Sequence, residues 1–265
     1  MKYCIAAFFL FAICLFSACQ STRSGPPALD RQHFTFAGST RCDTTSNTGV
    51  SVSVSYVLLK EDTEVARKIN DSLHLLAVHS IVNWLDSSSV AQSPDARTNL
   101  DKAAALFATD YEDVRKDMGS LNGCWELETT ADTVHAGPKA LTVKFETYAY
   151  TGGAHPTSNL TYYTFDRDTG RRLTLNDIVA DTTALLGVVE KAFRKQQSLL
   201  PQDNLEQQGY FLHDGRFFLP ENVGFNRDGM IFYYNSYEIA AYSVGPIQVT
   251  IPYEQLNGLL RDNWL

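Results

Sequence analysis

The sequence predicts an α+β fold: a largely antiparallel sheet with helices packed on one side, arranged as two closely packed subdomains. Helix-like and strand-like segments occur in separate groups along the chain, and consecutive strand-like segments are joined by turn residues typical of hairpins. The chain also contains 15 Phe, 13 Tyr and 3 Trp among its 265 residues, and this aromatic content suits packed β-structure.

In the first half of the chain, the pattern predicts a strand, two helices and a second strand. Residues 49–59 alternate mainly valine and serine, which is typical of a half-buried strand. Apolar residues then recur every three or four positions across residues 61–85 and again across 93–118, which predicts two amphipathic helices. Residues 123–134 return to a strand pattern.

In the second half of the chain, the pattern predicts hairpins interrupted by one helix. Residues 139–150 form a strand that ends at a glycine loop, and residues 158–175 form a hairpin with its turn at 168–170. A third helix occupies residues 182–200. Three further strand-like runs follow at residues 215–220, 230–239 and 246–253.

The pattern changes near residues 132–138, which predicts the boundary between the two subdomains. We assign residues 33–136 to an N-terminal α+β module and residues 137–265 to a C-terminal α+β module. Both cysteines expected in the folded part of the chain lie on the N-terminal side of this boundary.

The first residues predict an exported lipoprotein anchored to a membrane. An apolar run too short for a dependable membrane span follows Lys2 and ends in Phe-Ser-Ala-Cys, at residues 16–19. Small residues before a cysteine favour cleavage by a lipoprotein signal peptidase and a lipid on Cys19. Residues 1–18 are then the signal peptide, and the polar residues 19–32 are a flexible tether. The alternative is an ordinary secretory signal in which Cys19 has no special role.

The charge balance narrows the class of partner. The formal net charge is −8 at pH 7, and loss of Lys2 with the signal peptide makes it about −9. This acidic balance argues against nucleic acid and against polybasic attachment to anionic lipid. It favours a cationic partner, although an acidic surface is also ordinary for a soluble domain.

Cysteine usage supports export. Once Cys19 carries a lipid and the signal peptide is removed, Cys42 and Cys124 remain, and an even number in an exported chain predicts a disulfide. The bond closes a loop of roughly 80 residues, for which the chain-entropy model gives up to about 4.5 kcal/mol of stabilisation. The alternative is a pair of buried free thiols.

The stretch from Tyr150 to Pro156, YTGGAHP, predicts a stiff recognition loop between two tyrosine-bearing strands. Gly152 and Gly153 permit positive φ and close backbone approach, and the proline biases His155 toward extended geometry. No phosphate-loop lysine, no G-x-S-x-G elbow and no metal-binding histidine spacing occurs, so we expect no catalytic residue, metal or cofactor. The alternative role of the histidine is to cap a neighbouring carbonyl within a turn.

The second candidate segment is an aromatic bend at residues 233–246, which carries four tyrosines and one carboxylate. Glu238 lies among these rings, where it can act as an acid, pair with a tyrosine hydroxyl or receive a cation. Tyr237 and Tyr242 can supply contact area at low entropic cost. The alternative places some of these tyrosines in the core.

The two segments resemble the hallmarks of a known family. Residues 150–178 and residues 229–256 are similar, in motif and in order, to the extracellular domain of the lysozyme-sensing anti-sigma factor of certain Gram-positive bacteria. A related domain precedes the catalytic part of a peptidoglycan deacetylase. Residues 45–130 resemble, with weaker motifs, the module that commonly precedes this domain. The family's shared positions in this chain are Tyr150, Gly152, Gly153, His155, Tyr237, Glu238 and Tyr242.

The resemblance implies a non-catalytic binding domain, which in the sensor binds lysozyme, a cationic protein. No sigma-binding, membrane-spanning or deacetylase segment is recognisable here, so we expect the binding module alone, held by its lipid. We expect a periplasmic or cell-surface lipoprotein that binds a lysozyme-like protein or peptidoglycan. The alternatives are a cell-wall hydrolase or deacetylase-associated enzyme, with Glu238 or His155 as the hydrolase's candidate residue, and a structural envelope lipoprotein. Binding requires the glycine loop and the aromatic bend to converge on one exposed surface.

Overall fold

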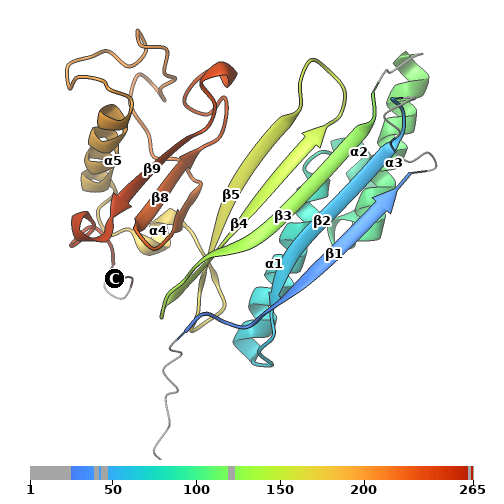
Figure 1. Cartoon of the computed structure of the whole chain (residues 1–265), viewed down its shortest axis with the longest axis horizontal. Helices are drawn as coiled ribbons and strands as arrows, with labels where there is room; N and C mark the ends of the chain where they lie inside the picture. The colour runs from blue at the N-terminus through green and yellow to red at the C-terminus, as the bar shows by residue number, and fades with distance from the viewer. Residues whose placement is uncertain (1–24, 39–41, 43–46, 119–122, 262–263, 265) are drawn as a thin grey trace, which may run out of the picture.

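A computed structural model of the chain describes residues 25–38, 42, 47–118, 123–261 and 264 (Figure 1). Six strands form one sheet in the same order as in the chain, β1 to β6. Neighbouring strands are antiparallel except β2 and β3, which are parallel. The strands are Leu29–Ala37 (β1), Val50–Leu59 (β2), Trp125–Ala136 (β3), Ala140–Tyr150 (β4), Thr157–Asp166 (β5) and Arg172–Leu173 (β6).

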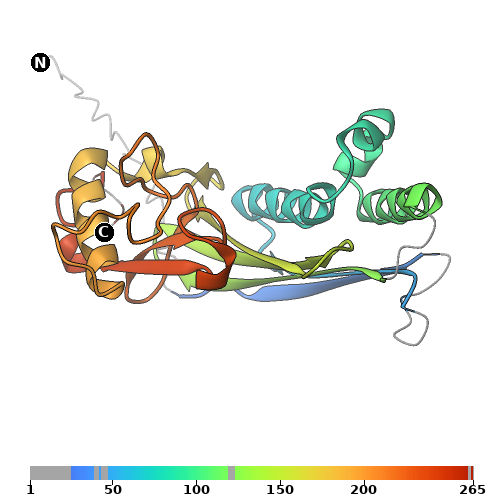
Figure 2. The same ribbon diagram turned by 90° about the horizontal axis from the view of Figure 1, so that it is seen from above.

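Helices form the long connection that the parallel pair of strands requires. Between β2 and β3 lie α1 (Glu64–Val82), α2 (Ser87–Gln92), the 3-10 helix η1 (Pro94–Arg97) and α3 (Leu100–Met118). Figure 2 shows these helices together on one side of the sheet. We call the other side of the six-stranded sheet the helix-free face. The predicted α+β class, with helices on one side of a mostly antiparallel sheet, is confirmed.

An N-terminal core fills the space between these helices and the sheet. In β2, the side chains of Val50, Val52 and Val54 are at most 2% exposed, because alternate residues of a strand point to opposite faces. Ile69 and Leu73, four residues apart in α1, are each 1% exposed and pack in the same core. Burial of each such side chain contributes about 1.5–3 kcal/mol, and this apolar contact holds the helices on the sheet.

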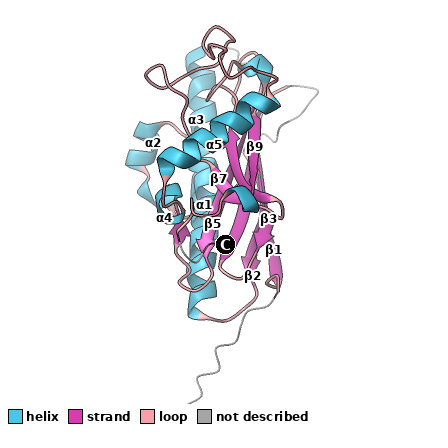
Figure 3. Cartoon of the chain, turned by 90° about the vertical axis from the view of Figure 1, so that its left-hand side faces the viewer, coloured by secondary structure: helices cyan, strands magenta, loops and turns pink. Residues whose placement is uncertain are grey.

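The C-terminal part of the chain has its own sheet and core. Strands β7 (Val223–Phe225), β8 (Gly229–Tyr234) and β9 (Ile247–Pro252) are antiparallel. Helix α5 (Thr182–Gln196) packs against β9, as Figure 3 shows. The remaining helical segments are α4 (Leu175–Ile178), η2 (Tyr242–Val244) and η3 (Tyr253–Gln255).

Two asparagine side chains join the second sheet to the edge of the first. Oδ1 of Asn222 accepts the N–H of Tyr162 at 2.8 Å, and its Nδ2 donates to the carbonyl of Leu160 at 2.6 Å. Oδ1 of Asn235 accepts the N–H of Leu160 at 2.8 Å, and its Nδ2 donates to the same carbonyl at 3.0 Å. The two amides replace a neighbouring strand along β5, because the short β6 pairs only with its far end.

Several segments differ from the expected secondary structure: the strand expected at residues 230–239 ends at Tyr234, for example, and the helix expected at 182–200 ends at Gln196. Strand β1 begins at Leu29, so residues 29–32, which the sequence assigns to a flexible tether, belong to the sheet. Residues 215–220 do not form the expected strand, and β7 follows them instead. Phe217 of this run is buried although it belongs to no strand, since its ring packs 5.1 Å from the Phe193 ring in the C-terminal core. Periodicity in so short a run does not distinguish a strand from a buried loop.

The predicted disulfide between Cys42 and Cys124 is present, with the two Cα atoms 5.2 Å apart. The large sheet is continuous across residue 137, where the sequence places the subdomain boundary, because β3 and β4 pair on either side of it. Phe145 of β4 and Phe165 of β5 pack in the N-terminal core. These two strands therefore share the sheet and core of the N-terminal module.

The part of the chain that the structure describes contains no helix with both the length and the apolar character needed to cross a membrane. The expected signal peptide and Cys19 lie outside the described residues. Within the described ranges, no three His, Cys, Asp or Glu side chains are grouped closely enough to hold a metal ion.

Candidate functional site

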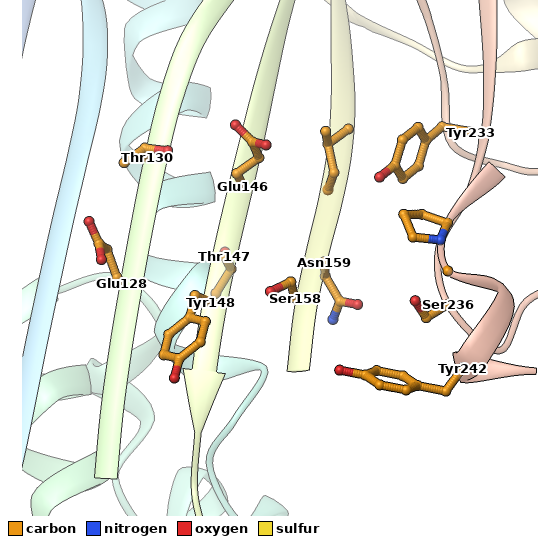
Figure 4. Close-up of a pocket in the computed structure, with 13 residues that line it drawn as sticks. Glu128, Thr130, Glu146, Thr147, Tyr148, Ser158, Asn159, Tyr233, Ser236 and Tyr242 are labelled. Atoms are coloured by element: carbon orange, nitrogen blue, oxygen red, sulfur yellow. The ribbon is translucent and has the colours of Figure 1, made fainter. Parts of the chain in front are cut away.

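A groove of about 520 Å³ lies between the six-stranded sheet and the C-terminal part of the molecule (Figure 4). Its volume falls in the range of small-ligand sites, roughly 300–1,000 Å³. We call it the β5 groove, since β5 forms one of its walls. The sheet contributes Glu128, Glu146, Tyr148 and Ser158, and the opposite wall contributes Tyr233 and Tyr242.

The sheet register brings the polar side chains of the groove together. Glu128 of β3 lies opposite Tyr148 of β4, and this tyrosine lies opposite Ser158 of β5. Because alternate residues of each strand pack in the N-terminal core, these side chains point to the helix-free face. Glu146 lies diagonally across from Glu128, one strand away.

The negative charge of the groove comes from its glutamates. Glu146 forms an ion pair with Lys144 at 2.6 Å, whereas no described residue forms an ion pair with Glu128. Burial, and then the nearby Tyr233 and Glu146, raises the pKa of Tyr162 to about 12. Burial likewise raises the pKa of Tyr233. Both phenols are therefore neutral at pH 7 and contribute hydrogen bonding rather than charge.

The glycine loop and the aromatic bend meet at the rim of the groove. The ring of His155 stacks on the ring of Tyr242, with centroids 4.2 Å apart and planes inclined by 17°. Tyr242 in turn stacks on Tyr237, with centroids 5.5 Å apart and planes inclined by 30°. The hydroxyl of Tyr242 also donates to the carbonyl of Pro156 at 3.3 Å. The convergence of these two segments, which the expected binding site requires, is thus observed.

The glycine loop owes its shape to backbone conformations that other residues rarely adopt. Gly152 and Gly153 have φ values of 90° and 103°, in the region that favours glycine. The hydroxyl of Tyr150 donates to the carbonyl of Gly153 at 3.0 Å and closes the loop. Tyr150 therefore supports the loop from within, while His155 supplies the ring that meets the aromatic bend.

Tyr237 occupies a backbone conformation that is unusual for its residue type. Its φ is 70°, and its side chain is 59% exposed. Bulky residues rarely adopt this region, and such strained positions cluster at functional sites. The N–H of Tyr237 donates to the carbonyl of Ala240 at 3.1 Å, which holds the turn. This backbone conformation places the ring of Tyr237 in solvent, stacked on the ring of Tyr242.

Glu238 has a structural role in this turn. Its carboxylate accepts the N–H of Asn235 at 3.0 Å and lies 3.5 Å from the amide nitrogen of the Asn235 side chain. The same asparagine binds the main chain of Leu160 in β5. Glu238 thus orients the side chain that attaches the aromatic bend to the large sheet. Among the described residues, no tyrosine hydroxyl forms a hydrogen bond with Glu238, and its expected roles as an acid or a cation receptor stay predictions.

Several residues of the groove were not identified from the sequence. Glu128, Glu146 and Tyr148 line it and belong to neither of the two motif segments, while Tyr233 lies in the aromatic bend but was not named as a site residue. The signal that could have identified the glutamates is their place on the polar face of two alternating strands, in WELETT and KFETY. That signal shows the face of each strand, but not which residues lie opposite each other.

Two known families match separate regions of the chain, and these regions form opposite walls of the groove. Residues 44–158 match a family described as deacetylase PdaC, and residues 176–254 match a family described as a protein of unknown function, DUF3298. The chain is similar to both domain families. Tyr148 and Ser158 belong to the first matched region, whereas Tyr233 and Tyr242 belong to the second. The groove therefore forms where the two regions meet.

Curated relatives match a smaller part of the chain. Immunogenic protein MPB64 of Mycobacterium bovis and immunogenic protein MPT64 of Mycobacterium tuberculosis are each 29% identical to it over 151 residues. The match covers 51% of this chain and 60% of each relative. The chain therefore spans less than two thirds of the length of these relatives.

Solved structures share the whole fold. A DUF3298 family member from Bacteroides fragilis superposes with a TM-score of 0.68 at 22% identity, over 90% of this chain and 95% of that one. A DUF3298 family protein from Pseudomonas aeruginosa PAO1 gives 0.60 at 19% identity, over 90% and 96% of the two chains. The arrangement of both sheets is thus common to these proteins. The link to an anti-sigma factor stays a prediction.

Proposed function

We propose that this chain is an exported, lipid-anchored protein of the cell envelope whose β5 groove binds a cell-wall-related partner without catalysing a reaction. The partner is a lysozyme-like protein or peptidoglycan. The observation that carries the proposal is the ring stack of His155, Tyr242 and Tyr237 at the rim of the groove. Two segments far apart in the sequence build this exposed aromatic surface together.

The chemistry of the site suits binding. Stiff aromatic side chains lose little entropy on contact and bury a large area, so they are common at the centres of recognition surfaces. The glutamates beside them complement a cationic protein or the amino groups of cell-wall peptides. The matches to the PdaC and DUF3298 families support an association with the cell wall.

The proposed anchor is a lipid on Cys19, followed by a tether as far as residue 28. Because β1 begins at Leu29, the folded part starts close to the proposed membrane attachment. Intact-mass analysis of the protein from a membrane fraction tests the anchor. A diacylglycerol adduct that is lost in Cys19→Ala supports it, and an unmodified N-terminus elsewhere overturns it.

Calorimetric titration tests the binding function directly. We expect affinity for hen lysozyme or for purified muropeptides that falls about tenfold in Tyr242→Ala, corresponding to about 1.4 kcal/mol of lost contact. Phe211→Ala is the matched control, since Phe211 is also an exposed aromatic residue but does not line the groove. Absence of binding to both probes at high micromolar concentration would overturn the proposal.

A glycan hydrolase is the second candidate function. The observation that favours it is the pair of carboxylates, Glu128 and Glu146, which share one groove on adjacent strands. Glycosidases use two such groups, one as an acid and the other as a base or nucleophile. Release of reducing sugars from peptidoglycan that disappears in Glu128→Gln or Glu146→Gln would establish this alternative, and no release by the unaltered protein would exclude it for that substrate.

A further inference from the structure

The outer edge of β5 has main-chain groups that point away from β4. The N–H and C=O of Leu160 and the N–H of Tyr162 bind the asparagine amides, so they face outward. In an antiparallel pair, residues two apart along a strand point their main-chain groups in the same direction. The N–H and C=O of Ser158 therefore face outward as well.

The groove lies beside this exposed main chain. No described residue forms a hydrogen bond with the outward N–H or C=O of Ser158. Ser158 lines the β5 groove, and Figure 4 shows it separated from Tyr242 and Ser236 on the opposite wall. The carbonyl of Pro156, two residues before it, is already bound by the hydroxyl of Tyr242. The open edge is thus short, because the main-chain groups of Pro156 on one side and Leu160 on the other already form hydrogen bonds.

We propose that the β5 groove binds an extended peptide segment carrying a lysine or arginine, whose main chain pairs with Ser158. This inference rests on the proposed function and names the chemistry of its partner. An unpaired strand edge is a template for another chain, and addition of a strand is a recurring mode of peptide recognition. Within a folded protein, the main-chain groups of such an edge usually form hydrogen bonds with neighbouring residues. The asparagine side chains supply these bonds at Leu160 and Tyr162.

The side chains around the groove favour a cationic residue in the bound segment. A side chain that points to the helix-free face beside Ser158 meets the ring of Tyr148, which lies opposite that serine. A long cationic side chain can lie across this ring and reach toward Glu146 and Glu128 at the far side of the groove. The net charge of −8 attracts such a segment at long range.

A peptide fits this pattern better than a sugar. Pairing with both main-chain groups of one strand residue requires an N–H and a C=O on the same side of the ligand, as a neighbouring strand residue presents them. The acetamido group of a sugar is a single trans amide, whose N–H and C=O point in opposite directions. The main chain therefore favours a peptide, either a segment of a protein or a cell-wall stem peptide, and the experiment distinguishes these sources.

Titration with blocked peptides tests the pairing. The probe is acetyl-Ala-Ala-Lys-Ala-Ala-amide. One matched peptide carries an N-methyl group on the lysine amide, and the other carries norleucine in place of lysine. We expect binding of the first peptide, with each matched peptide at least about tenfold weaker, since one loses a main-chain donor and the other loses the charge. Equal affinity of the parent and N-methyl peptides would overturn the pairing.

Two variants at one position separate the main chain from the side chain. Ser158→Pro removes the outward N–H and restricts φ, which an edge strand tolerates, and we expect it to weaken binding of the lysine peptide about tenfold or more. Ser158→Ala alters the side chain but keeps the outward N–H, so we expect it to bind the lysine peptide more tightly than Ser158→Pro does. A thermal melt will show whether Ser158→Pro folds. If it does not fold, the affinity of the N-methyl peptide for the unaltered protein tests the main-chain pairing instead.

The same variants distinguish this inference from the proposed function. If lysozyme or a muropeptide binds and Ser158→Pro weakens that binding, the bound source is identified and the inference is supported. If either partner binds Ser158→Pro as tightly as the unaltered protein and the blocked peptides do not bind, the inference is overturned while the proposed function stands. If no probe binds, both are overturned.

Discussion

At the scale of single residues, polar side chains at turns hold the segments that frame the groove. Glu238 accepts the N–H of Asn235 at 3.0 Å and so orients the asparagine whose side chain forms hydrogen bonds with β5. Asp177 holds the start of α4 in a similar way. One of its carboxylate oxygens accepts both the N–H and the hydroxyl of Thr174, at 2.8 and 2.7 Å. In each case a short local contact fixes the direction of a longer element.

Asp177 makes the stability of the protein sensitive to acid. The hydrogen bonds from Thr174, and then the Arg171 side chain, lower its pKa to about 2. Because this pKa lies below the unfolded value of about 3.9, the contribution is present above pH 4 and is lost as the pH falls through 2. We expect Asp177→Asn to flatten the decline in unfolding free energy over that range, as measured by urea titration.

Glu206→Gln serves as the control for the acid dependence. Glu206 is exposed, and its carboxylate forms no hydrogen bond with any described residue. It should leave the acid branch of the curve unchanged. An Asp177→Asn protein whose stability falls as steeply as that of the unaltered protein between pH 4 and 2 would contradict the role given to Asp177.

At the scale of elements, α1 shows how periodicity becomes packing. The N-cap Thr63 accepts the N–H of Ala66 at 3.1 Å and begins the helix. From there, the residues on one face of the helix pack against β2, while those on the other face contact solvent. The helix is held by that contact more than by its own propensity, because most helical stability in proteins comes from tertiary packing of an amphipathic face.

Leu73→Ala tests this packing. Leu73 is 1% exposed in the N-terminal core, so its truncation should lower the free energy of unfolding by about 2–5 kcal/mol, as measured by urea denaturation. Leu75→Ala is the matched control in the same helix, since Leu75 is 38% exposed. We expect a loss of less than about 1 kcal/mol there. Equal effects of the two substitutions would refute the proposed orientation of α1.

At the scale of the whole molecule, two cores meet at the edge of β5. The N-terminal core takes its buried residues from β2–β5, α1, η1 and α3, with partly buried residues of β1 packed against it, whereas the C-terminal core lies between α5 and the three-stranded sheet. Asn222 and Asn235 bridge them through the main chain of β5, and beside that bridge the ring of Tyr162 packs edge-on against the ring of Tyr233. The β5 groove is the space that remains where this junction ends.

Asn222→Ala tests the junction. It removes two hydrogen bonds and leaves the N–H of the buried Tyr162 without its partner, so we expect a loss of about 2–4 kcal/mol in unfolding free energy. The exposed Asn257, which makes one hydrogen bond of 3.3 Å to Glu254, supplies the control Asn257→Ala. Its loss should stay within about 0.5 kcal/mol. A smaller loss for Asn222→Ala than for the control would contradict the bridging role.

The disulfide acts on the whole N-terminal module. The double variant Cys42→Ser/Cys124→Ser should lose up to about 4.5 kcal/mol of unfolding free energy, because the unfolded chain gains the freedom of an open loop. Reductant should destabilise the unaltered protein to a similar extent and leave the double variant unchanged. Insensitivity of the unaltered protein to reductant would show that the bond contributes no stability.

Much of the fold could be predicted because its signals are local. Alternation in Val50, Val52 and Val54 predicts the buried face of β2 without reference to any other strand. The strand expected at residues 215–220 failed because Phe217 is buried by rings from other elements, which no local pattern reveals. The two segments that form the ring stack could be named from their motifs. Their partner Glu128 could not, since it reaches the groove only through cross-strand register.

By itself, the sequence determined the α+β class, most helices and strands, the disulfide partners and the two segments that converge at the groove. These features depend on spacing, composition or motif, all of which lie along the chain. Only the tertiary structure decided that β2 and β3 are parallel, that Glu128 and Glu146 share a groove, and that Ser158 has an open edge. The reason is that register and edges arise from pairing between distant segments, whose partners no local pattern specifies.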